Sequence, residues 1–499
     1  MMPHQRMMCR VLAFPQLLRP MMAFIGDKSM NFSSLSFIFL FLPLFVLVHA
    51  VAKGKLRNAV LFLGSILFYT LAIGKQYEWI ILLLLSSLVN YILGLLLADS
   101  RGRYRKAILV TGVIYNLAVL CLYKYADVWM TALMPALAKL LHVGQAAPNI
   151  LLPLGLSFYT FKNLSYLHEV YAEKVRAEES YIRYGAYLMM FPQISMGPIQ
   201  TYESFRSYLD DRTVTLAAIN NGAVEFILGL GLKTIFANRL GSVWSGIETI
   251  GYDSISTPLA WMGILTYSLQ LYFDFYGYSL MASGIGEMLG YVTPKNFDYP
   301  YTATSMSDFW RRWHMSLGAW FKENVYFPLG GNRCSKLLNL RNLLVVWVLT
   351  GIWHGSTVTF LIWGLFLFAV VAIEKTGVLK KVTEHKFWSH VYMIPLILLS
   401  WTIFRLPTFG DLGTYFSRMF PFFGETPEHV YAADWVKYAK GVGALAVIGI
   451  LFCTPLPRKL FEKIRSKPLL SVPILLAIFW YAVYLAACGA NDPFLYFNF

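Results

Sequence analysis

Two histidines are the residues of this chain that could do chemistry in apolar surroundings. The first, His354, ends the run NLLVVWVLTGIWHG, where Trp353 and Gly355 flank it. Imidazole titrates near neutrality, and burial favours the neutral form that can accept a proton from an attacking hydroxyl. Such general base catalysis is typically worth ~10²–10⁴ in rate. A histidine in a membrane helix can equally be a hydrogen-bonding partner of its neighbours, and the residue alone leaves both interpretations open.

The second histidine, His314, lies in SMSDFWRRWHMSLGAWFKENVYFPLGGNR, which runs from Ser305 to Arg333. Ser305 and Asp308 have the spacing of a capping box at a helix start. An apolar stripe follows at helical spacing, made of Trp310, Trp313, Leu317 and Trp320. We therefore expect one amphipathic helix that lies in the membrane interface or borders a water-filled funnel. A surface anchor would explain the tryptophans and arginines, but not His314.

A polar pair interrupts another apolar stretch, LQLYFDFYGYS, where Gln270 and Asp274 share one helical face. An Asp at the centre of a membrane helix costs about 2.5–3.5 kcal/mol on insertion scales, so it needs a reason to be there. We expect Asp274 to pair with Arg311 or Arg312, and the sequence leaves open whether this ion pair is structural or belongs to a site. The candidate substrate-binding residues are Gln270, Asp274, Arg311, Arg312 and Trp353.

Other reactive residue types carry no chemistry that their spacing supports. The remaining histidines lie in predicted loops or lack polar neighbours, and are His4, His49, His142, His168, His385, His390 and His429. The five cysteines show neither metal-ligand nor disulfide spacing, and we interpret them as small hydrophobes. Gly-x-Ser-x-Gly, Walker and HExxH motifs are absent, so an ATP-driven pump or a zinc hydrolase is unsupported. We predict no metal site and no tightly bound cofactor.

Lipid is the solvent that the composition of this chain predicts. It is 57% hydrophobic and 14% charged, with a mean hydropathy of +0.54, whereas soluble domains carry about a quarter charged residues. We predict an all-α polytopic membrane protein with about ten to thirteen membrane segments in one integrated domain. The clearest apolar runs are 36–52, 57–74, 79–98, 107–123, 358–373, 441–456 and 472–488.

Residues 184–200 are apolar but include Pro192, Gln193, Gly197 and Pro198. Irregular backbone at membrane depth is tolerated only where it is buried in protein or lines a cavity. We therefore expect this segment inside the protein rather than against lipid.

The net charge of +15 comes from lysines and arginines gathered in short loops, at 53–57, 101–106, 380–386 and 458–467. Cationic loops stay cytoplasmic in membrane proteins, so this pattern indicates membrane topology rather than nucleic-acid binding. It predicts that the first helix starts outside and that the C-terminus also lies outside.

The cationic leader opposes that topology. Residues 1–29 carry Arg6, Arg10, Arg19 and Lys28, and Met30 then opens the uncharged start MNFSSLSFIFLFLPLF. Prolines and Arg19 break the apolar part of the leader, which is unlike a signal peptide. We expect translation to begin at Met30 and residues 30–499 to form a single membrane domain.

Several long motifs, in this order, resemble the membrane-bound O-acyltransferase family, and within it the bacterial alginate O-acetyltransferase branch. They are MNFSSLSFIFLFLPLF, LPLGLSFYTFKNLSYL, FPQISMGPIQ, YFDFYGYSLMASGIGEMLGY, NFDYPYTATSMSDFWRRWHMSLGAWFKENVYFPLGGNR, LLVVWVLTGIWHGSTVTFLIWG and PFLYFNF. The likeness covers essentially Met30 to Phe499. It implies a ring of transmembrane helices around a central funnel that narrows to a tunnel, in the cytoplasmic (inner) membrane.

The resemblance also implies roles. The family's Trp-His-Gly histidine falls on His354, which would act as general base, and the histidine of its Trp-Arg-Arg-Trp-His motif falls on His314, which would position or assist. The implied reaction passes an acyl group, here acetyl, from a cytoplasmic thioester such as acetyl-CoA to a hydroxyl of an extracytoplasmic, alginate-like polysaccharide. A separate periplasmic or extracellular acetyltransferase would be the partner.

One departure from the family pattern stands at Leu280, where the family usually has Asp after Gly-Tyr-Ser. It leaves both histidines untouched but weakens any statement about the substrate. Two alternatives stay open: D-alanyl transfer to teichoic acid by a relative of the same superfamily, and a non-enzymatic polysaccharide exporter that uses the same polar passage.

Overall fold

The computed structural model describes residues 30–133, 150–423 and 430–488. Within those ranges every regular element is a helix, which confirms the all-α prediction. The leader 1–29 and the terminal FLYFNF motif lie outside the described residues.

Eight helices of the described part are long and apolar enough to cross a membrane, which confirms a multi-pass protein. They are α3 (Lys55–Ile73), α4 (Tyr77–Asp99), α5 (Gly102–Lys124), α17 (Lys336–His354), α18 (Val358–Thr376), α20 (Lys386–Arg405), α22 (Asp434–Phe452) and α24 (Pro468–Cys488). A shorter apolar helix precedes them at Phe37–Val51 and includes α2 (Leu42–Val51). The expectation of ten to thirteen segments stays a prediction, as does the central funnel.

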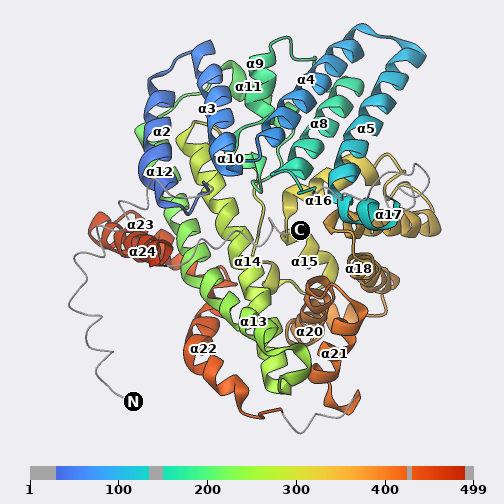
Figure 1. Ribbon diagram of the computed structural model, residues 1–499, viewed down its shortest axis with the longest axis vertical. Helices are drawn as coiled ribbons and strands as arrows, with labels where there is room; N and C mark the ends of the chain where they lie inside the picture. Colours follow the sequence, from blue (N-terminus) through green and yellow to red (C-terminus); the bar gives the residue numbers. More distant parts are fainter. Residues whose placement is uncertain (1–29, 134–149, 424–429, 489–499) are drawn as a thin grey trace, which may run out of the picture.

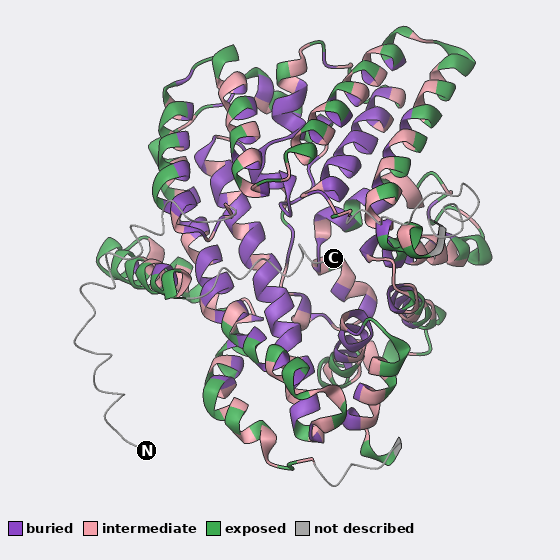
Figure 2. Cartoon of the chain, in the orientation of Figure 1, coloured by how far each residue is buried: buried purple, intermediate pink, exposed green. Residues whose placement is uncertain are grey.

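The buried middle of the molecule consists of helices that are too short or too polar to count as spans. Figure 1 shows α14 (Thr257–Met288) running through the centre, and Figure 2 shows it and α8 (Leu156–Tyr171) as mostly buried. A continuous helical path, α12 (Leu216–Gly231), η5 (Leu232–Ala237) and α13 (Asn238–Ile250), packs along α14.

Glycines allow this packing. A Cβ on Gly229 would lie 2.5 Å from the Gly277 carbonyl oxygen, and a Cβ on Gly222 would lie 2.2 Å from that of Gly284. Small residues at such crossings let helix backbones approach closely in membranes.

Short helices connect these blocks. They are α9 (Tyr181–Leu188), α10 (Phe191–Ile194), α11 (Tyr202–Asp210), α15 (Met306–Arg312), α16 (Met315–Phe321), η8 (Lys322–Tyr326), α21 (Phe409–Met419) and α23 (Leu456–Arg465). The irregular segment 184–200 is buried from Tyr184 to Gln200, as its prolines and glycine predicted.

The expectation of one amphipathic helix around His314 is wrong. Ser305 does cap a helix, because its side chain accepts from the Asp308 N–H at 3.0 Å. The helix ends at Arg312, however, and His314 adopts a left-handed conformation (φ 44°) before α16 begins. Trp313 and Trp320 are buried in the protein rather than spread at a membrane interface.

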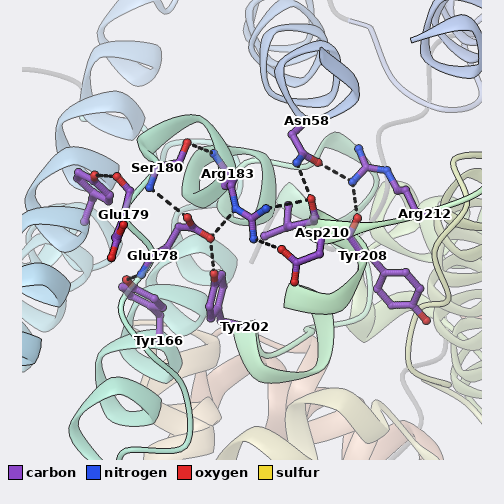
Figure 3. A network of polar contacts seen from close by, with 12 residues as sticks. Asn58, Tyr166, Glu178, Glu179, Ser180, Arg183, Tyr202, Tyr208, Asp210 and Arg212 are labelled. Carbon is purple, nitrogen blue, oxygen red and sulfur yellow. Dashed lines mark hydrogen bonds and ion pairs between the residues drawn. The ribbon is translucent and has the colours of Figure 1, made fainter. Parts of the chain in front are cut away.

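A polar network joins the first turn of α3 to α9 and α11 (Figure 3). Arg183 donates to Glu178 at 2.9 Å and to Asp210 at 2.6 Å. Arg212 donates to Asn58 at 2.8 Å. The network reaches His49, whose Nε2 lies 3.2 Å from an Arg212 nitrogen, so the expectation that this histidine lacks polar neighbours is wrong.

Candidate active site

His354 is the last residue of α17, in the tight turn that leads into α18. A Cβ on the following Gly355 would lie 2.4 Å from the Phe360 ring, so only glycine fits there without displacing that ring. A Cβ on Gly351, one turn earlier in α17, would lie 2.5 Å from the Phe360 carbonyl oxygen. The two glycines therefore allow the end of α17 to pack closely against the start of α18, and this packing fixes the position of the imidazole.

Aromatic rings from three segments surround the imidazole. Ring centroids lie 4.6 Å away for Trp353, 5.0 Å for Trp363 on α18 and 4.9 Å for Phe404 on α20. His354 is 8% exposed. Such a cage excludes bulk water from most of the ring and strengthens the electrostatic interactions that the imidazole makes.

Two cavities meet at this imidazole. The Lys124 cavity, about 650 Å³, is lined by the ends of α3, α4 and α5, the segment 152–158, Ser195, Tyr278 and Trp353. The Trp347 cavity, about 360 Å³, is lined by residues of α14 to α18 and α20. Among the described residues, His354 is the one that lines both. A ligand in either cavity can therefore reach the same ring.

Polar side chains of the Lys124 cavity come from segments far apart in the sequence. Its lining includes Asn31, Lys75, Gln76, Lys124 and Ser157, and no Asp or Glu among the described residues. The Lys124 ammonium lies 5.6 Å from the centroid of the Trp353 ring, a cation–π distance. Sequence reasoning missed Lys124, because a lysine that ends an apolar run looks like an ordinary membrane-boundary residue.

His314 lines the Trp347 cavity together with Trp310, Trp313 and Trp347. Its left-handed backbone is uncommon outside glycine and is held by the surrounding structure. The Met315 N–H donates to the Asn296 carbonyl oxygen at 2.9 Å, which closes the turn on the loop after α14. The structure thus brings both predicted catalytic histidines to one cavity.

Asn296 also sets the tautomer of His314. The Asn296 Oδ1 accepts from the Ser316 hydroxyl at 2.9 Å and lies 3.1 Å from the His314 Nδ1. Because that oxygen can only accept, Nδ1 carries the proton and Nε2 is the basic nitrogen. Burial lowers the pKa of His314, which is outside the eight long apolar helices, to about 3, so the ring is neutral at pH 7.

The predicted ion pair of Asp274 with an arginine of the Trp-Arg-Arg-Trp motif is wrong. Asp274 pairs with Lys233 of η5 at 2.5 Å, and both side chains are almost fully buried. The two arginines pair with Asp308 instead, Arg311 at 3.2 Å and Arg312 at 2.9 Å. The reason is helix packing: η5 faces α14, whereas α15 supplies its own acid one turn before the arginines.

The remaining candidate residues divide by their distance from the cavities. Trp353 lines the Lys124 cavity, whereas Gln270, Asp274, Arg311 and Arg312 line neither cavity at His354. Gln270 instead packs against α13, where a Cβ on Gly241 would lie 2.3 Å from its Nε2.

Comparison with known proteins finds similarity to membrane-bound acyltransferases. The profile of the membrane-bound O-acyltransferase family matches residues 66–404. A protein described as a probable alginate O-acetylase AlgI, from Pseudomonas syringae pv. tomato, is 34% identical over 396 residues, 79% of this chain and 76% of the relative. A peptidoglycan O-acetyltransferase of Helicobacter pylori is 31% identical over 75% of this chain and 76% of the relative. A teichoic acid D-alanyltransferase of Bacillus subtilis is 30% identical over 44% of this chain and 58% of the relative.

Proposed function

Because the chain belongs to the membrane-bound O-acyltransferase family, we propose that it transfers an acetyl group from a cytoplasmic acyl thioester to a hydroxyl of an extracytoplasmic polysaccharide. The chain is a multi-pass membrane O-acyltransferase. The names of the alginate and peptidoglycan relatives support a polysaccharide acceptor in their branch of the family.

In this proposal His354 is the general base. Its neutral imidazole takes the proton of the acceptor hydroxyl as that oxygen attacks the thioester carbonyl carbon. The tetrahedral intermediate then collapses, the carbon–sulfur bond breaks, and the imidazolium returns the proton to the leaving thiolate. Proton and electrons balance, and the ring ends in the form in which it began.

The two cavities divide the substrates in this proposal. The Lys124 cavity takes the acceptor, since its lining offers amide, hydroxyl and ammonium groups to a sugar, with Trp353 as a stacking surface. The Trp347 cavity takes the acyl end of the donor, with His314 beside it. Of the five candidate substrate-binding residues, Trp353 is the one that this division favours.

Acetyl-CoA is the donor that we propose, and a periplasmic or extracellular acetyltransferase is the partner that completes delivery. Residues 30–499 would act as one domain. The observation that carries the whole proposal is that His354 lines both cavities.

The test is to measure ester-linked acetate on surface glycans of cells that carry the wild-type chain, His354→Ala or no copy of the gene. We expect acetate to be lost equally in the last two strains while the amount of glycan exported stays unchanged. Acetylation that persists while export falls would instead support the exporter alternative. Ester-linked alanine in place of acetate would support D-alanyl transfer, for which the Bacillus subtilis relative covers 44% of this chain.

A further inference from the structure

A second pair of cavities lies away from His354, against the cationic helix α23. The Leu280 cavity, about 520 Å³, is formed by α12, η5, α14, α22, α23 and α24. The Asn296 cavity, about 290 Å³, lies against α14 and the loop that follows it. Their linings share Tyr276, Leu280, Tyr299 and Arg458, so the two cavities adjoin.

The two cavities differ in polarity. Most of the Leu280 cavity is aliphatic or aromatic, with residues such as Ile235, Phe236, Phe461 and Ile478. The Asn296 cavity is lined by hydroxyl, amide and charged groups from Ser279, Ser283, Lys295, Asn296 and Glu225. An apolar chamber that opens to a polar one matches an amphiphile with a hydrocarbon chain and a polar head.

Positive charge stands where the head of such an amphiphile would lie. Arg458 and Lys463 line the Leu280 cavity, and no carboxylate does so among the described residues. Arg458 bonds Glu225 at 3.0 Å and Glu462 at 2.7 Å, which fixes its guanidinium in place. Lys463 is exposed and takes part in none of the ion pairs of the described chain. It can therefore pair with an anion from outside the protein.

The helix that carries these cations has the character of a membrane-surface helix. On α23, leucines Leu456 and Leu460 are about half exposed, next to exposed Lys459 and Lys463. Clustered lysines beside exposed apolar side chains favour the headgroup region of a leaflet with anionic lipid. The positive-inside pattern assigns residues 458–467 to the cytoplasmic leaflet.

Leu280 stands where the two cavities adjoin. Its side chain lines both of them. A carboxylate there would stand in the shared wall and oppose entry of a hydrocarbon chain. Leucine removes that obstacle.

The Asn296 cavity is also adjacent to His314 of the candidate active site. Asn296, which lines it, is the residue whose Oδ1 lies 3.1 Å from the His314 Nδ1. A head group in this chamber would pack against the residue that sets the His314 tautomer.

We propose that the Leu280 and Asn296 cavities form one binding site for an anionic phospholipid of the cytoplasmic leaflet. One acyl chain occupies the Leu280 cavity, the phosphate pairs with Lys463, and the polar head lies toward Asn296. This site goes beyond the acyl transfer proposed above and does not depend on it.

The test is native mass spectrometry of the full chain, purified in a mild detergent with added phosphatidylglycerol. We expect the wild type to retain about one phosphatidylglycerol per chain. Leu280→Asp should reduce that occupancy at least fivefold by adding a carboxylate, and Ile235→Trp should do so by filling the chamber. The matched control is Leu451→Trp, an exposed α22 leucine that lines neither cavity, which should leave occupancy unchanged.

Lys463→Gln adds a test of charge. It should lower retention of phosphatidylglycerol but not of uncharged diacylglycerol. Equal retention in the wild type and both cavity variants, or no retained lipid in the wild type, would overturn the proposal. If Leu280→Asp does not elute as a monodisperse protein, Ile235→Trp against Leu451→Trp decides alone.

Discussion

The Lys124 cavity and the Trp347 cavity meet at one imidazole, yet they are built from different parts of the chain and from different side chains. The first draws on α3, α4, α5 and the loops between them, and it holds two lysines and several amides and hydroxyls. The second draws on α14 to α18 and α20, and its wall is mostly apolar and includes five tryptophans. Two substrates of different polarity can thus be kept apart until they reach His354.

The comparison teaches that His354, the proposed general base, belongs to neither cavity alone. The α17–α18 turn fixes the position of its ring, and apart from His354 the two cavities have different lining residues. A substitution in the lining of one cavity can therefore leave both the ring and the other cavity unchanged. We therefore expect three kinds of substitution: those that alter His354, where the two cavities meet, those that alter one cavity, and those that alter neither.

The largest effect on acetyl transfer is expected at His354. His354→Gln keeps a polar side chain but removes the base, and we expect acetyl transfer by the purified protein in vesicles to fall ~10²–10⁴-fold. Donor cleavage in the absence of acceptor should fall by a similar factor, since both reactions need the same base. Transfer within twofold of wild type would contradict the role of this ring.

A smaller loss of activity is expected at Asn296, which contacts His314 but does not line the Trp347 cavity. Asn296→Ala removes the hydrogen bond that orients His314, and misplacement of a group at a reaction centre can cost about 10²-fold. We expect kcat to fall by up to that factor while KM for the acceptor changes little. Ser283→Ala, in the same polar chamber as Asn296, is the matched control and should leave kcat within twofold.

Lys124→Met should separate the two cavities. Loss of one charge-assisted hydrogen bond costs about 1.5–3 kcal/mol, so we expect at least a tenfold fall in kcat/KM for the acceptor. Donor cleavage without acceptor should be unchanged, because Lys124 does not line the Trp347 cavity. Lys106→Met, at an exposed lysine near the other end of α5, serves as control. Equal losses for donor and acceptor would argue against separate cavities.

The smallest effect is expected at Arg311, in the most recognisable motif of the chain. Its side chain is 73% exposed and lines neither cavity. Arg311→Gln should change kcat/KM for either substrate less than twofold in the same vesicle assay. A tenfold loss would show that the site extends to this arginine.

The sequence predicted the helical membrane class well, because uncharged apolar runs of about 20 residues are long enough to cross a bilayer and are rare in soluble domains. It also singled out two histidines in long and specific motifs, which the structure brings to one cavity while their catalytic roles stay a prediction, and it predicted the burial of the irregular segment 184–200. These features are local in the chain, so a single sequence can reveal them.

Other features, within the site and around it, depend on contacts between distant segments. Apolar periodicity predicted one helix through His314. The helix is instead interrupted there by hydrogen bonds to Asn296, which is several helical turns away in the sequence, so spacing rules within a helix do not reveal it. In the same way, the partner of Asp274 is Lys233 on a separate helical element. Lys124 reaches the cavity only because α5 ends beside Trp353.

The most direct test of the central claim is a cryo-EM structure of the protein with a non-cleavable thioether analogue of the acetyl donor. The account predicts that the analogue's acyl end occupies the Trp347 cavity, with its carbonyl carbon beside the His354 imidazole and the Lys124 cavity left open for the acceptor. An analogue bound with its carbonyl in the Lys124 cavity, or out of reach of His354, would contradict it.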